Sequence, residues 1–117
     1  MRIASWNVNS AKARQDQILN YLRAGSCDVL LIQETKTQDV NFPVGWYQEL
    51  GWHVAFHGQK SYNGVAIAAR MPLDKVTKGL PDDGEDEQAR YMEATVGDVR
   101  VATIYLPNGN PAPGPKF

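Results

Sequence analysis

The chain has 117 residues, of which 43% are hydrophobic and 21% charged, and its formal net charge is −1. This length suits one domain, and this composition is ordinary for a globular protein. A near-neutral net charge excludes a chain that binds nucleic acid through bulk positive charge, so any phosphate-binding surface has to be local. The single cysteine, Cys27, excludes an internal disulfide and favours a buried thiol in a reducing compartment.

The first residues lead directly into a strand-like pattern and have neither the charged segment nor the apolar segment of a signal peptide. No apolar run approaches the roughly 18 residues that a membrane-spanning helix needs. The simplest prediction is a cytoplasmic protein.

Hydrophobic periodicity predicts a strand-helix-strand unit at the start of the chain. Apolar and polar residues alternate over residues 2–8, which is typical of a strand, and residues 29–32 form a continuous apolar run, as in a strand covered on both faces. Between them, Ile18 and Leu22 share one helical face and indicate a helix over about residues 13–24. Such a unit almost always forms a right-handed crossover between parallel strands, so we expect the carboxyl ends of both strands at one edge of the sheet.

Two polar side chains lie at these strand ends, Asn7 and Glu34. We expect them to meet, a carboxamide beside a carboxylate. Hard cations such as Mg²⁺ take oxygen ligands and usually need only one or two protein carboxylates together with substrate phosphate. The sequence therefore predicts a cation site here, with an ordinary ion pair between Glu34 and Lys36 or Arg2 as the simpler alternative.

The rest of the chain predicts one more helix and several strands. Residues 43–50 read as a short helix, with a proline at its first turn and a glycine after its end. Further strands are expected at residues 53–57, 64–69, 74–78, 91–96 and 99–106.

This pattern is a mixed sheet with two helices, which can cover one face of the sheet and leave the other without a layer. The chain ends in a stretch rich in proline and glycine, residues 107–117. We therefore expect part of a larger protein, cut in a loop, or a chain that buries the open face by self-association.

Five motifs, in order along the chain, resemble the exonuclease III family of bacterial abasic-site endonucleases, within the endonuclease/exonuclease/phosphatase superfamily. They are WNVNS (6–10), QETK (33–36), KSYNGVAI (60–67), QARY (88–91) and IYLPNG (104–109). The resemblance implies an α/β (α+β), DNase I-like fold, a four-layer αββα sandwich of two mixed sheets face to face with helices outside. Residues 1–117 would form its N-terminal portion, a mixed β-sheet with covering helices.

The resemblance also implies a site for a divalent cation, usually Mg²⁺, with Mn²⁺ as an alternative ion. In that family Glu34 matches the carboxylate that holds the metal, Asn7 matches the amide beside it, and Tyr105 matches the catalytic tyrosine at the scissile phosphate. Contacts to DNA phosphates are implied for Asn9, Tyr62, Asn63, Arg90 and Asn108. Some relatives have aspartate at the position of Asn9, which would be a stronger metal ligand. Phosphate contacts position a duplex without reading its sequence, which suits recognition of a missing base.

The implied function is DNA repair by a Mg²⁺-dependent phosphodiester hydrolase that acts on double-stranded DNA. It would incise beside abasic sites and would have 3′–5′ exonuclease and 3′-phosphatase activity at blocked 3′ ends. The second half of the family's domain supplies further aspartates and an Asp-His pair, so we expect this chain alone to be inactive.

Two alternatives stay open. The first alternative is a phosphoinositide or sphingolipid phosphoesterase, because the metal motifs of the first half are shared across the superfamily. The second alternative is a non-catalytic binding relative, such as the catabolite repression control protein. The presence of Asn7, Glu34 and Tyr105 argues against a loss of catalytic residues in this half.

Overall fold

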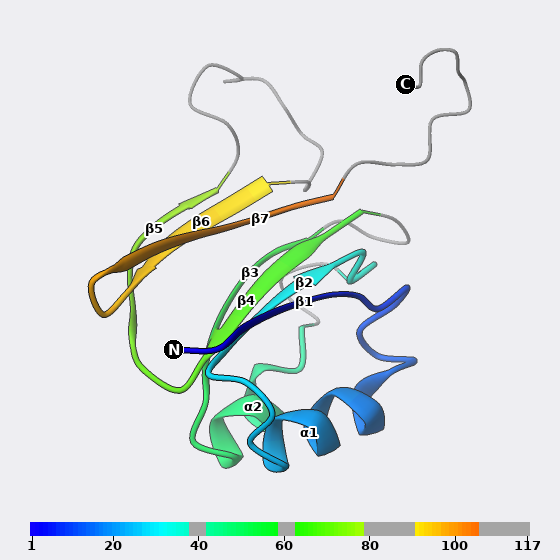
Figure 1. Cartoon of the computed structure of the whole chain (residues 1–117). Helices are drawn as coiled ribbons and strands as arrows, with labels where there is room; N and C mark the ends of the chain where they lie inside the picture. The colour runs from blue at the N-terminus through cyan, green and yellow to red at the C-terminus, as the bar shows by residue number, and fades with distance from the viewer. Residues whose placement is uncertain (38–41, 59–62, 79–90, 106–117) are drawn as a thin grey trace.

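A computed structural model describes residues 1–37, 42–58, 63–78 and 91–105 (Figure 1). Each predicted helix and strand is present, with bounds that differ by at most a residue or two at the ends. The elements in chain order are β1 (Ile3–Asn7), α1 (Gln15–Arg23), β2 (Val29–Gln33), α2 (Val44–Glu49), β3 (His53–His57), β4 (Val65–Ala69), β5 (Leu73–Lys78), β6 (Tyr91–Val96) and β7 (Val99–Ile104). Within the described ranges, neither helix is long and apolar enough to cross a membrane.

The strands form two sheets rather than one. The first has the order β1-β2-β4-β3, and β1 pairs in parallel with β2, as the crossover through α1 predicts. The second has the order β5-β6-β7 and is antiparallel throughout. Figure 1 shows three layers, with both helices on one side of the four-stranded sheet and the three-stranded sheet on its other side.

The expectation of an uncovered sheet face is therefore wrong. Alternate residues of β6, Met92, Ala94 and Val96, are fully buried in a cluster that also contains Val65 and Ile67 of β4. The error arose because strand patterns show that β5, β6 and β7 exist but not that they pair only with each other. Since the second sheet covers this face, the reason for expecting self-association through it is lost.

The strand β1 leaves part of the inner face open. The parallel register pairs Ile3 with Val29 and Asn7 with Gln33, so these residues point toward the second sheet. Val29 is fully buried, whereas Ile3 is 45% exposed. The three-stranded sheet therefore ends over β2, and Asn7 remains accessible.

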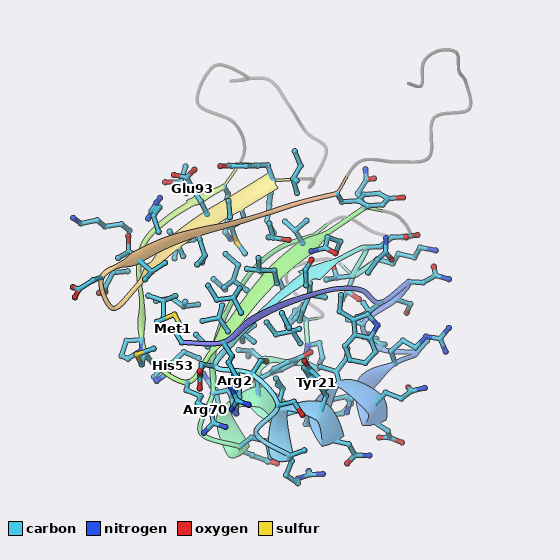
Figure 2. The ribbon with its side chains drawn as sticks, in the orientation of Figure 1. Met1, Arg2, Tyr21, His53, Arg70 and Glu93 are labelled. Carbon is cyan, nitrogen blue, oxygen red and sulfur yellow. The ribbon has the colours of Figure 1, made fainter. Side chains whose placement is uncertain are left out.

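A second core lies between the helices and the four-stranded sheet. It contains Ile18 and Leu22 of α1, Tyr47 of α2, Leu30 of β2 and the buried free thiol of Cys27. The helical stripe and the buried thiol that the sequence predicts are thus confirmed. Figure 2 shows Tyr21 of α1 on this helix side and Glu93 of β6 at the three-stranded sheet, on the opposite side of the molecule.

The edge strand β5 contains an irregularity. Its pairing with β6 shifts register between Asp74 and Thr77, and Lys75 has a φ of 53°. The carbonyl oxygen of Lys75 accepts a hydrogen bond of 2.7 Å from Arg100 Nη1. This β-bulge bends the strand while keeping its displaced carbonyl paired.

Candidate metal and phosphate site

The candidate site lies at the carboxyl ends of β1 and β2, as predicted. Asn7 is the last residue of β1 and is paired with Gln33, the last residue of β2, so Glu34 follows one residue beyond this pair. Asn7 is exposed, and the Glu34 side chain is 19% exposed. A carboxylate and a carboxamide thus stand at one sheet edge, both accessible from solvent.

The ammonium group of Lys36 contacts two acceptors of this site, one on Glu34 and one on Asn9. Its Nζ lies 3.2 Å from Glu34 Oε2 and donates a hydrogen bond of 2.6 Å to Asn9 Oδ1. The ammonium therefore lies between a carboxylate and an amide oxygen, two donor types that a hard cation takes. Arg2 is engaged elsewhere, because its Nη2 donates to Gly25 O over 2.7 Å. The ion pair with Lys36 is therefore present, and the alternative pair with Arg2 is not.

The backbone around the site is held by a set of hydrogen bonds between loops. Thr35 N donates to Gly64 O over 3.0 Å, and Lys36 N donates to Asn63 O over 2.8 Å. On the other side, Ser10 N donates to Glu34 O over 2.8 Å. The left-handed region of φ is occupied by Asn9, Ser10, Glu34, Lys36, Asn63 and Gly64. Non-glycine residues in this conformation persist only where surrounding structure fixes them, and such residues cluster at functional sites.

Tyr105 comes directly after β7. It is partly buried and packs against the cluster between the two sheets. Figure 1 shows that β7 ends at the same side of the molecule as β1 and β2. The structure therefore brings the predicted catalytic tyrosine to the side of the fold that carries Asn7 and Glu34.

The predicted phosphate contacts are only partly described. Tyr62, Arg90 and Asn108 lie outside the described residues. Asn9 is exposed beside Lys36, whereas Asn63 is 5% exposed and uses its backbone carbonyl to hold the loop after β2. Asn63 is thus less accessible to a phosphate than Asn9.

Two polar residues of this region, Gln33 and Thr103, carry no predicted role in the sequence. Gln33 is 8% exposed and Thr103 is 2% exposed, and Gln33 Nε2 donates to Thr103 Oγ1 over 3.0 Å. The only signal in the sequence is a glutamine at the end of an apolar strand, which by itself does not name a partner.

The donor set fits a Mg²⁺ ion that keeps waters and substrate phosphate as its other ligands. Across the part of the chain that the structure describes, no three His, Cys, Asp or Glu side chains gather to form a metal cage. Mg²⁺ rarely uses such cages and is usually held by one or two carboxylates with phosphate oxygens. Glu34 would supply one carboxylate and Asn7 an amide oxygen, and Asn9 Oδ1, which Lys36 contacts, lies at the same edge.

Residues 4–116 match the sequence profile of the Endonuclease/Exonuclease/phosphatase family. The chain belongs to this family. Among its curated relatives, exodeoxyribonuclease III of Haemophilus influenzae is 34% identical over 113 residues, covering 93% of this chain and 42% of that protein.

Solved structures of the family agree with the fold. A 3′ phosphatase from Neisseria bound to a product DNA hairpin is 44% identical, with a TM-score of 0.90 over 93% of this chain and 42% of that chain. An AP endonuclease from Archaeoglobus fulgidus is 36% identical, with a TM-score of 0.88 over 93% of this chain and 42% of that chain. The predicted DNase I-like fold is thus confirmed, and the chain spans about two fifths of the length of the relatives it matches.

Proposed function

We propose that this chain forms the metal- and phosphate-binding part of a Mg²⁺-dependent nuclease of DNA repair. The observation that carries the proposal is the meeting of Glu34, Asn7 and Asn9 at one sheet edge, with β7 delivering Tyr105 to the same side. The names of the relatives, an exodeoxyribonuclease III, a 3′ phosphatase and an AP endonuclease, support DNA as substrate. The reaction would be phosphodiester hydrolysis beside abasic sites and removal of groups that block 3′ ends.

Each residue of the site has a defined part in this proposal. Glu34 and Asn7 would hold the cation, and a bound Mg²⁺ would neutralise charge on the phosphate oxygens and orient the phosphate. The Tyr105 hydroxyl would donate a hydrogen bond to an oxygen of the scissile phosphate, where a preorganised donor is worth about 3 kcal/mol. Asn9 and, from the family resemblance, Tyr62, Arg90 and Asn108 would hold flanking phosphates of the duplex.

The chain by itself is proposed to bind the ion without cutting DNA. Hydrolysis also needs a group that activates water and one that protonates the leaving oxygen. Both histidines of the chain, His53 and His57, lie on β3, which β4 separates from β2. His53 is paired with Ala69 at the end of β4 farther from Glu34, and His57 is paired with Val65 at the nearer end. A cytoplasmic location goes with this function, since the free thiol of Cys27 stays reduced there.

Metal binding by the chain is the first test. Binding of Mn²⁺, as a paramagnetic substitute for Mg²⁺, is measured by titration for the chain and for its Glu34→Gln variant. The matched control is Glu49→Gln, at the exposed end of α2. We expect Glu34→Gln to remove binding and Glu49→Gln to leave it unchanged. Equal binding by all three proteins would contradict the metal site.

The substrate is tested in a chimera in which this chain replaces the matching part of the Neisseria 3′ phosphatase. The assay compares an abasic DNA duplex, a duplex with a 3′ phosphate and a phosphoinositide head group. We expect DNA to be hydrolysed and Glu34→Gln to lower that rate about 100-fold, or ~2.7 kcal/mol in the barrier. Preference for the head group would favour a lipid phosphoesterase, and a folded but inactive chimera would favour a binding protein.

A further inference from the structure

Gln33 forms a polar bridge across the two sheets. The two hydrogens of its Nε2 are shared among three acceptors, which are Ser5 Oγ on β1 at 3.0 Å, the carbonyl of Leu31 at 3.2 Å and Thr103 Oγ1 on β7 at 3.0 Å. One side-chain amide therefore joins three strands of two different sheets.

Thr103 completes the bridge. Its hydroxyl accepts the hydrogen bond from Gln33 and donates one of 3.4 Å to the carbonyl of Ile32. Thr103 is 2% exposed and is paired on β6 with Met92, a buried residue of the inter-sheet cluster. A buried hydrogen-bonded pair favours one relative position of its two strands. Separating the pair would leave a buried donor or acceptor unsatisfied, which costs more free energy than the hydrogen bond itself contributes.

The bridge lies directly beside both halves of the candidate site. Gln33 immediately precedes Glu34, and Thr103 is two residues before Tyr105. In an extended strand, residues two apart share a face, so Tyr105 continues the line of Thr103 toward the site. The cluster of apolar side chains between the sheets, which contains Val65, Ile67 and Met92, makes contacts that are not directional.

We propose that Gln33 and Thr103 are positioning residues that fix Tyr105 relative to Glu34 by locking the end of β7 onto the end of β2. The role of Tyr105 at the phosphate rests on the proposed function, whereas the lock itself can be tested without metal or DNA. A donor misplaced by 1 Å can lower a rate roughly 100-fold, so a buried bridge at this point has a direct consequence for the reaction.

The first arm of the test uses the metal-free chain with ring-labelled tyrosine, the Tyr105 resonance being assigned with Tyr105→Phe. Thr103→Val removes the hydroxyl and keeps the shape, and Thr103→Ser restores the hydroxyl. The matched control is Thr95→Val, on the outer face of β6, where the hydroxyl accepts from Arg100 Nη1 over 2.9 Å. We expect Thr103→Val to shift the Tyr105 resonance and increase ring motion, Thr103→Ser to restore both, and Thr95→Val to change neither.

An unchanged Tyr105 resonance in folded Thr103→Val would overturn the inference. Should Thr103→Val not fold, Gln33→Asn tests the same bond from β2, because it withdraws the amide by one methylene. A folded Gln33→Asn in which Tyr105 is unchanged would overturn the inference equally.

The second arm adds Mn²⁺ and measures the paramagnetic broadening of Tyr105 against that of Val65, which lies opposite Gln33 on β4. We expect Thr103→Val to weaken broadening at Tyr105 and to leave it unchanged at Val65. Absence of broadening at both residues, with the first arm positive, would remove the proposed metal site but leave the lock standing. Equal broadening of Tyr105 in the wild-type chain and Thr103→Val would overturn the proposed link to the site.

Discussion

A β-carbon built on Gly64 would lie 2.0 Å from Thr35 Oγ1. Gly64 has a φ of +96°, and Thr35 is 1% exposed, so the threonine side chain has no open space to move into. The same pair is joined through the backbone, where Thr35 N donates to Gly64 O over 3.0 Å. The loop that carries Glu34 therefore packs directly against the backbone of Gly64, just before β4, where no side chain fits.

Gly64→Ala is expected to destabilise the chain by about 3 kcal/mol, the sum of overpacking and an unfavourable φ. The control is Gly45→Ala in α2, where nothing lies within 4 Å of the added carbon. Alanine in a helix is expected to stabilise by about 0.5–1 kcal/mol, so the two variants should move the urea midpoint in opposite directions. A midpoint for Gly64→Ala that equals or exceeds the parent value would show that the loop can relax.

Asn9→Asp is expected to raise the affinity for Mn²⁺ on the order of tenfold, because added ligand charge tightens binding of hard cations. The side chain stands at the right place, since Asn9 Oδ1 already accepts a hydrogen bond from Lys36 Nζ over 2.6 Å. Asn20→Asp on α1 adds the same charge away from the site and should leave the affinity unchanged. Equal gains in both variants would assign the effect to net charge alone.

Lys36→Met is expected to raise Mn²⁺ affinity by about 1 kcal/mol, the scale of a like-charge interaction at about 4 Å in water. The ammonium lies 3.2 Å from Glu34 Oε2 and so competes with a metal for the same carboxylate. Calorimetric titration of Lys36→Met should be compared with Lys12→Met, which removes an exposed lysine before α1. A lower affinity in Lys36→Met would mean that Lys36 helps to shape the site.

Protonation of Glu93 is expected to destabilise the chain in acid. The hydrogen bond from the Tyr91 hydroxyl, and then that from Arg100, hold the pKa of Glu93 below its ordinary value of 4.5. A lowered pKa in the folded state contributes stability that is present above pH 4.5 and is lost as the pH falls through the folded-state pKa.

Tyr91→Phe removes the larger of these two causes. We expect carboxyl-carbon NMR titration to show a rise in the pKa of Glu93, with a weaker acid dependence of stability. Tyr21→Phe, on α1 at the helix side, is the control and should change neither quantity. An unaltered pKa in Tyr91→Phe would place the whole effect on Arg100.

The sequence predicts the helices and strands well because local hydrophobic periodicity determines them. It also predicts that Asn7 and Glu34 are adjacent, because strand-helix-strand crossovers between parallel strands are almost always right-handed. It does not predict the second sheet, because the alternation in β6 is the same whichever strand lies opposite it. The position of Lys36 depends on left-handed backbone at Glu34 and Lys36, with φ of 62° and 56°, which no periodic pattern encodes. The bond between Gln33 and Thr103 joins residues 70 apart, so it depends on how the sheets stack.

The bulge at Lys75 also bears on how this chain meets other chains. A straight edge strand offers a regular row of unpaired amide and carbonyl groups on which a foreign strand can build. In β5 that row is interrupted, the carbonyl of Lys75 is already taken by Arg100, and Asp74, Lys75 and Lys78 are exposed around it. A foreign strand that paired with β5 would have to desolvate these charged side chains and remove the β-bulge. The β-bulge and the charged side chains therefore disfavour amyloid-like pairing of other chains with β5.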